Sequence, residues 1–242
     1  MGHWLWTVKA NSPMMNPEMH APHDDLSAHS APWPLWARLG QLLAGLLLYG
    51  FSLALFVRAD LGLDPWDVFH QGLSRQTHLA IGTWVIIVAA AVLLLWIPLR
   101  LRPGVGTISN AILIGLALNW ILPVLPAPHG LPGRWLFLVG AILLCGVATG
   151  MYIGADLGPG PRDGLMVGLA SRGHSLRVVR TIIELIVLVT GFLLGGTVGI
   201  GTVLFAVTIG PIAHVTIPAF AHGAGRVGKR RPPAYEMGGS TA

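Results

Sequence analysis

The chain has 242 residues, of which 53% are hydrophobic and only 10% are Asp, Glu, Lys or Arg. A soluble domain carries about 25% charged residues, so this composition excludes an ordinary water-exposed surface and predicts that apolar segments face lipid. The formal net charge of +5 could suggest nucleic acid, but its distribution along the chain has a simpler explanation in membrane topology. We therefore expect the lipid bilayer, and no nucleic acid, as a partner.

Six apolar runs of 19 to 21 residues follow a polar N-terminal segment. Residues 1–34 lack the apolar centre of a secretory signal and are predicted to be a flexible tail. The runs cover residues 39–57, 81–99, 105–125, 135–153, 176–194 and 200–220. Roughly 20 residues of helix cross a hydrocarbon core. Residues 223–242 form a second, basic tail, and the sequence predicts an all-α polytopic membrane protein of about six transmembrane helices.

Two further segments carry the pattern of a helix start. Asp64 precedes Pro65, and Asp67 follows three residues after Asp64. An Asp N-cap, a proline at the first helical position and an acidic residue in the first turn favour a helix there. The corresponding residues later in the chain are Gly160, Pro161 and Asp163.

These starts predict short helices over residues 65–76 and 161–172. Each is about 18 Å long, too short to cross a bilayer. Such helices either lie in the headgroup plane or enter the membrane as re-entrant segments, which are tolerated where protein or a water-filled cavity surrounds them. Both alternatives stay open from the sequence.

The chain contains an internal repeat. Residues 60–67 and 156–163 match at five of eight positions at an offset of 96, and residues 104–107 match 199–202 at an offset of 95. Residues 35–126 and 127–222 are therefore expected to be two membrane repeats. Because each contains three runs, an odd number, the second repeat should be inverted relative to the first, an arrangement found in secondary transporters.

Positive charge predicts the orientation, because Lys and Arg concentrate on the cytoplasmic side of membrane proteins. One side would hold twelve such residues, namely Lys9, Arg38, Arg100, Arg102, Arg162, Arg172, Arg177, Arg180, Arg226, Lys229, Arg230 and Arg231. The other side would hold three, namely Arg58, Arg75 and Arg134. Both termini are therefore expected to be cytoplasmic.

Glu184 is the acidic residue that lies inside an apolar run. It follows Leu176 by about 12 Å of helix, and Arg180 lies one turn before it. Arg177 lies a further turn toward the cytoplasm. Ionisable residues at such depth are costly and often functional. The alternatives are a coupling or substrate carboxylate held by Arg180, and a structural ion pair between helices.

Other polar residues have two interpretations each. Asp60 and Asp156 could bind a cation or substrate, or could support loops, whereas capping is favoured for Asp67 and Asp163. Asn119 and His214 correspond at the offset of 95 and could contact a polar substrate, although hydrogen bonding between helices is favoured. The Gly-x-Gly-Thr segments at 104–107 and 199–202 could bind an anion or allow a tight turn. Three glycines at spacing four favour close packing within the fold or in a homo-oligomer, namely Gly146, Gly150 and Gly154.

No catalytic constellation is apparent. The sequence has no zincin, nucleophile-elbow or Walker motif. Its single cysteine, Cys145, allows neither an intrachain disulfide nor a thiolate metal site. We expect no metal, no cofactor and no enzymatic activity.

Three segments resemble bacterial membrane proteins of the YczE/YyaS/YitT class. They are residues 60–73 (DLGLDPWDVFHQGL), 82–84 (GTW) and 102–107 (RPGVGT). The resemblance covers roughly residues 38–220 and weakens in the second repeat at Pro159, Gly160 and Arg162. It implies a multi-span protein of the bacterial inner membrane and supplies no functional residues.

Two functions are favoured by these observations over a third, an intramembrane enzyme. The first is a small-solute transporter or a channel-like protein with an inverted-repeat core. The second is a non-transporting scaffold or accessory protein that recruits a cytoplasmic partner through its tails.

Overall fold

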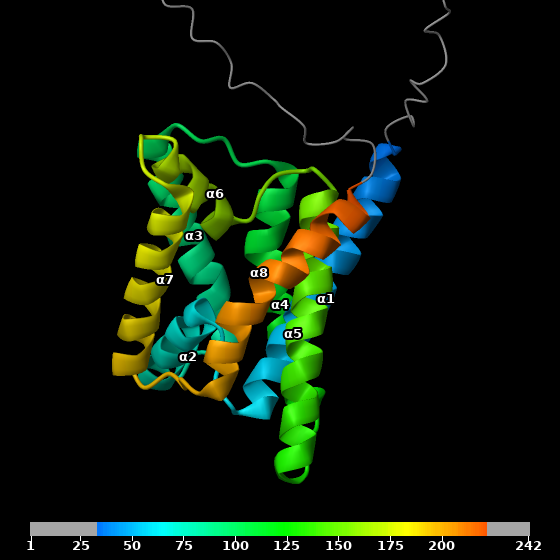
Figure 1. Ribbon diagram of the computed structural model, residues 1–242, viewed down its shortest axis with the longest axis vertical. Helices are drawn as coiled ribbons and strands as arrows, with labels where there is room; N and C mark the ends of the chain where they lie inside the picture. Colours follow the sequence, from blue (N-terminus) through cyan, green and yellow to red (C-terminus); the bar gives the residue numbers. More distant parts are fainter. Residues whose placement is uncertain (1–32, 222–242) are drawn as a thin grey trace, which may run out of the picture. The chain divides into compact units, whose positions relative to one another are not determined.

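The computed structural model describes residues 33–221, which form eight helices and, within that range, no strand (Figure 1). The helices are α1 (Leu35–Ala59), α2 (Pro65–Thr77), α3 (Ile81–Leu99), α4 (Val105–Val124), α5 (Gly130–Gly154), α6 (Pro161–Ala170), α7 (Leu176–Leu193) and α8 (Ile200–Phe220). The predicted tails, apart from residues 33 and 34, lie outside this range.

Each predicted run contains a helix. Five of them, α1, α3, α4, α5 and α8, are long and apolar enough to cross a membrane. The sixth, α7, has 18 residues and contains Arg177, Arg180 and Glu184. The two short helices also lie where the helix starts predicted them, but α6 ends at Ala170, two residues early, where residues 171–174 form a turn.

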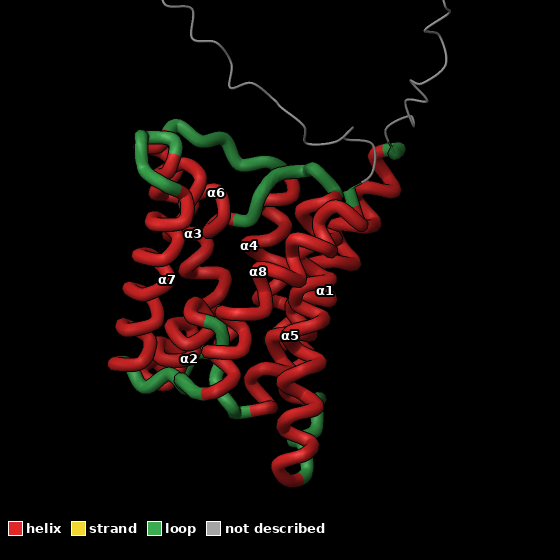
Figure 2. The backbone as a smooth tube through the Cα atoms, in the orientation of Figure 1, coloured by secondary structure: helices red, strands yellow, loops and turns green. Residues whose placement is uncertain are grey.

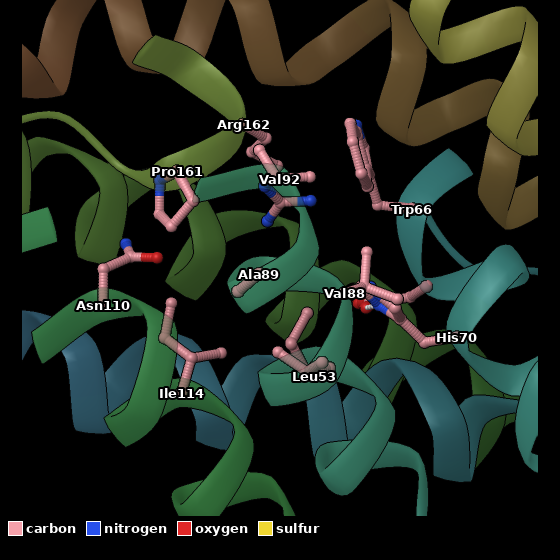
Figure 3. Close-up of a pocket in the computed structure, with 12 residues that line it drawn as sticks. Leu53, Trp66, His70, Val88, Ala89, Val92, Asn110, Ile114, Pro161 and Arg162 are labelled. Carbon is pink, nitrogen blue, oxygen red and sulfur yellow. Dashed lines mark hydrogen bonds and ion pairs between the residues drawn. The ribbon is translucent and has the colours of Figure 1, made fainter. Parts of the chain in front are cut away.

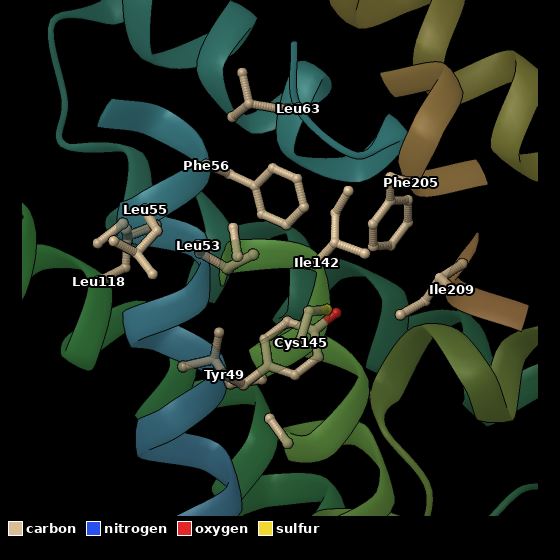
Figure 4. Packing of buried hydrophobic residues seen from close by; sticks show 14 of the residues in the cluster. Tyr49, Leu53, Leu55, Phe56, Leu63, Leu118, Ile142, Cys145, Phe205 and Ile209 are labelled. Atoms are coloured by element: carbon tan, nitrogen blue, oxygen red, sulfur yellow. The ribbon is translucent and has the colours of Figure 1, made fainter. Parts of the chain in front are cut away.

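The centre of the helix assembly is α1, which packs along α5 and also against α4, while α5 packs against α8. Leu46, Leu53 and Phe56 of α1 are fully or almost fully buried, and they meet Ile142 and Cys145 of α5 (Figure 4). Phe205 of α8 stacks edge-to-face on Phe56, with ring centroids 5.7 Å apart. This apolar cluster fixes the long helices around which the short helices are placed.

The glycine face of α5 is covered by α8. A β-carbon added to Gly146, Gly150 or Gly154 would meet, in order, Ile212, Thr216 and Phe220 at less than 3 Å. The Thr216 hydroxyl also donates to the Gly146 carbonyl at 2.7 Å. Of the two predicted roles for this face, close packing within the fold is the one that the structure shows.

Contacts within the two halves, and contacts between them, occur in matching pairs. The pair α1 and α4 corresponds to α5 and α8, and the pair α2 and α7 corresponds to α6 and α3 (Figure 2). The largest difference is that α3 packs extensively against α4 whereas α7 and α8 share no comparable contact. The second half is therefore more open between its last two long helices.

Two arginines make equivalent contacts at an offset of 96. Arg38 Nε donates to the Ala155 carbonyl at 2.9 Å, and its guanidinium also contacts Asp156. Arg134 Nε donates to the Ala59 carbonyl at 2.9 Å, and its guanidinium contacts Asp60. Each half thus holds the end of the other half's first helix.

The two sequence motifs of the repeat also contact each other across the halves. Gly106 N–H donates to the Leu157 carbonyl, and Gly201 N–H donates to the Leu61 carbonyl, both at 2.8 Å. These first-turn N–H groups are therefore engaged by the chain itself, which disfavours the anion-binding interpretation of the Gly-x-Gly-Thr segments. Only glycine fits beside them: Gly62 has a φ of +110°, and its β-carbon would lie 2.6 Å from the Gly199 nitrogen.

Candidate functional site where α2 and α6 begin

The two short helices begin beside one another in the interior of the helix assembly. Asp64 caps α2, because its Oδ1 accepts hydrogen bonds from the Trp66 and Asp67 N–H groups at 2.9 and 3.0 Å. Pro161 begins α6, and its carbonyl accepts a hydrogen bond from the Trp96 indole at 3.0 Å. The repeated helix-start motif therefore places Trp66 and Arg162, which correspond at an offset of 96, side by side.

Arg162 is the central charge of this region. Its Nη2 donates to the Tyr49 hydroxyl at 2.6 Å, and its Nη1 lies 3.8 Å from Asp64 Oδ1. The guanidinium lies over the Tyr49 ring at 5.6 Å and the Trp66 ring at 5.9 Å, both within cation–π range. The side chain of Arg162, which the topology prediction counted among loop charges, therefore turns inward to this aromatic and acidic environment.

Buried polar atoms around Arg162 lack partners among the described residues. They are Asp64 Oδ2, Asp67 Oδ2 and Trp66 Nε1, and each residue is at least 94% buried. Arg162 therefore compensates only part of the negative charge that Asp64 and Asp67 bring to this region.

Two further side-chain contacts complete the group around Arg162. We call this group the Arg162 cluster, and its members are Tyr49, Asp64, Trp66, Asp67, His70, Tyr152, Arg162 and Asp163. Asp67 Oδ1 lies 2.9 Å from His70 Nδ1, and both side chains are buried. The Tyr152 hydroxyl donates to Asp163 Oδ2 at 2.6 Å. Asp67 and Asp163 therefore pair with side chains, in addition to placing negative charge in the first turns of α2 and α6.

Two pockets flank the Trp66–Arg162 pair, and both residues line both pockets. The first pocket has a volume of about 40 Å³ and lies among α1, α2, α3, α4 and α6 (Figure 3). The second has a volume of about 130 Å³ and reaches α5, α7 and α8. Their linings correspond through the repeat, as shown by the pairs Leu53 and Thr149, His70 and Met166, Val88 and Glu184, and Ile114 and Ile209.

The second pocket joins the cluster to Glu184. Arg180 Nε donates to Glu184 Oε1 at 2.8 Å, and both residues line this pocket together with Asp64, Arg162 and Asp163. The predicted pairing of Arg180 with Glu184 is therefore present, and it opens onto a cavity rather than onto an apolar helix contact. Arg177 is exposed in the first turn of α7.

The remaining candidates lie elsewhere. Asp60 and Asp156, which have φ values of 49° and 53°, end the first long helix of each half and pair with the arginines described above. Asn119 donates to the Thr83 hydroxyl at 3.1 Å between α4 and α3, whereas His214 is exposed on α8. The structure does not bring these four residues to the Arg162 cluster.

Sequence reasoning missed Tyr49, His70 and Tyr152 as members of the site. Tyr49 and Tyr152 lie within apolar runs and carry no motif, and their role depends on contacts 113 and 11 residues away in the chain. One signal was present, since Arg162 stands where the first copy of the motif has Trp66. Within residues 33–221, no group of three His, Cys, Asp or Glu side chains is placed to hold a metal ion.

Comparison with known protein families gives a match over most of the chain. Residues 36–218 match the family of unknown function DUF6198. The chain belongs to this family. No solved structure matches it.

Its relatives include three bacterial proteins. One from Haemophilus influenzae, described as an uncharacterized protein, is 46% identical over 174 residues, covering 72% of this chain and 80% of the relative. The uncharacterized membrane protein YczE of Bacillus subtilis is 33% identical over 178 residues, covering 72% of this chain and 83% of YczE. The uncharacterized protein YyaS of the same organism is 26% identical over 181 residues, covering 72% and 89%.

These matches confirm the resemblance to YczE and YyaS, while the resemblance to YitT stays a prediction. Together with the apolar helices, the match to a membrane protein identifies this DUF6198 member as an integral membrane protein.

Proposed function

We propose that this DUF6198 protein is a small-solute transporter of the bacterial inner membrane, with α7 as a sixth spanning helix and its two halves inserted in opposite orientations. The observation that carries the proposal is the Arg162 cluster, a set of buried and partly buried charges between two pockets that correspond through the repeat. Charged groups inside a membrane protein are costly and commonly mark a substrate or ion pathway. Repeat interfaces near the midplane are where transporters of this architecture bind their substrates.

The depth of the cluster supports re-entrant short helices. Tyr49 lies ten residues before the end of α1, which corresponds to about 15 Å along the helix axis. Asp64 reaches the level of Tyr49 through the contacts that both make with Arg162. Residues 60–64 therefore turn back into the assembly before α2 leads outward, as expected for a re-entrant segment that lines a cavity.

The reciprocal contacts support the inverted arrangement. A two-fold relation between the halves accounts for the equivalent bonds of Arg38 and Arg134 and for those of Gly106 and Gly201. Cytoplasmic termini remain favoured when Arg162, Arg177 and Arg180 are left out of the charge comparison, because nine positive residues then face three.

Uptake into proteoliposomes tests the proposal. Full-length protein would be assayed with radiolabelled guanidinium, methylammonium, sulfate, acetate and glycerol, against protein-free liposomes and the variant Arg162→Gln. We expect at least one of these solutes to enter faster with the protein and the gain to fall at least tenfold in Arg162→Gln. Entry no faster than in protein-free liposomes for all five solutes would contradict transport.

The same assay separates transport from the scaffold alternative. A transporter with its site among α1, α2 and α6 should retain uptake when residues 223–242 are deleted. Uptake that disappears with this deletion, in protein that is still correctly assembled, would assign the function to the C-terminal segment instead.

A further inference from the structure

The second pocket has an excess of negative charge. Its lining includes three carboxylates, Asp64, Asp163 and Glu184, and two guanidinium groups, Arg162 and Arg180. Asp64 is 98% buried, and its Oδ2 has no partner among the described residues. An uncompensated charge in such surroundings is expensive unless a counter-ion or a proton neutralises it.

The aromatic walls of the pocket suit an organic cation. Tyr49 and Trp66 already hold the guanidinium of Arg162 against their ring faces. Tyr152 and Phe205 line the same pocket on the α5 and α8 sides. Aromatic faces beside carboxylates are the usual surroundings of bound ammonium and guanidinium groups. The guanidinium of Arg162 already occupies such surroundings here, which indicates that a cationic ligand group of the same kind would be accepted.

The size and position of the pocket limit the ligand. Its volume is about 130 Å³, which is well below the roughly 300 Å³ at which drug-sized sites begin. It extends to Arg180 and Glu184 on α7 and to Gly210 on α8, the two helices that lack extensive mutual contact. A small ligand could therefore reach Asp64 from the gap between α7 and α8.

We infer that the pocket bounded by Asp64, Asp163 and Glu184 binds a small organic cation that carries one ammonium or guanidinium group. The inference rests on the proposed transport function and gives its substrate class. An anion would face the excess of carboxylates and would have to displace Glu184 from Arg180. The corresponding first pocket has Val88 in place of Glu184 and a volume of about 40 Å³, so we assign the cation site to the second pocket alone.

Equilibrium dialysis of the full-length protein in detergent with radiolabelled guanidinium tests this site. We expect saturable binding that unlabelled methylammonium displaces and that sodium at equal concentration does not. Losing one charge-assisted contact costs about 1.5–3 kcal/mol, so Glu184→Gln should weaken binding by roughly tenfold or more. Asp163→Asn provides a second isosteric variant at the other wall of the pocket.

Asp156→Asn is the matched control, because it also removes one carboxylate but acts on a side chain that is 79% exposed and paired with Arg38 outside the pocket. It should bind guanidinium within about twofold of the wild type. No saturable guanidinium binding, equal displacement by sodium, or unchanged binding in both pocket variants would overturn the inference.

The outcomes distinguish this inference from the transport proposal. Guanidinium binding without uptake of any tested solute would retain the site and reject transport. Uptake of sulfate or acetate without guanidinium binding would retain transport and reject the cation site.

Discussion

The pocket beside α3 and the pocket beside α7 occupy corresponding positions in the two halves and share Trp66 and Arg162. In the first half α3 packs against α4, and Val88 faces a cavity of about 40 Å³. In the second half α7 and α8 are apart, and Glu184 faces a cavity of about 130 Å³. The repeat thus provides the framework twice, while differences such as Val88 against Glu184 leave one pocket small and give the other a larger volume and a further carboxylate.

The largest effect is expected from removing Arg162, the charged residue that lines both pockets. Arg162→Gln should lower the free energy of unfolding by about 3 kcal/mol, because it leaves Asp64 buried without its cation. Thermal unfolding in detergent measures this loss. Arg172→Gln is the control, since Arg172 is exposed and donates to the Pro98 carbonyl, and it should change stability by about 0.5 kcal/mol at most.

A double variant tests the cause of that loss. Arg162→Gln combined with Asp64→Asn should recover part of the stability, because the unpaired carboxylate is then absent. Equal losses in the single and the double variant would show that Arg162 acts through packing against Tyr49 and Trp66 alone.

The glycines that join the halves should give the next largest effect. Gly62→Ala and Gly158→Ala place a methyl group within 2.8 Å of atoms of the opposite half, Thr202 Oγ1 and Thr107 Oγ1 respectively. Gly173 also has a positive φ, but its surroundings are open, so Gly173→Ala controls for backbone strain. Each of the two crowded variants should be about 1–3 kcal/mol less stable than Gly173→Ala; equal stability of all three would argue against the close approach.

The smallest effect should come from the two equivalent arginines. Arg38→Ala and Arg134→Ala each remove bonds to the end of the opposite half's first helix, and each should cost about 1 kcal/mol. Arg102→Ala, in the exposed loop between α3 and α4, serves as the neutral control. Loss of stability in only one of the two variants would show that the halves are not held in the same way.

Local chemistry explains how much the sequence could predict. Asp64 and Pro65 specify the start of α2 through short-range capping, and the apolar runs specify the long helices through their length. The offset of 96 also relates Arg38 to Arg134, so the repeat in the sequence is enough to predict that these two arginines make equivalent contacts. The pairing of Tyr49 with Arg162 could not be predicted, because it depends on how α1 and α6 meet in space. The gap between α7 and α8 could not be predicted either, because no local feature of these two helices indicates it.

Sulfhydryl labelling of intact cells tests the inverted arrangement most directly. Leu79 and Ser175 correspond at the offset of 96 and are both exposed, whereas the native Cys145 is buried. Leu79→Cys and Ser175→Cys would be treated with a membrane-impermeant maleimide before and after permeabilisation. We expect Leu79→Cys to react in intact cells and Ser175→Cys to react only after permeabilisation; reaction of both from the same side would contradict oppositely oriented halves.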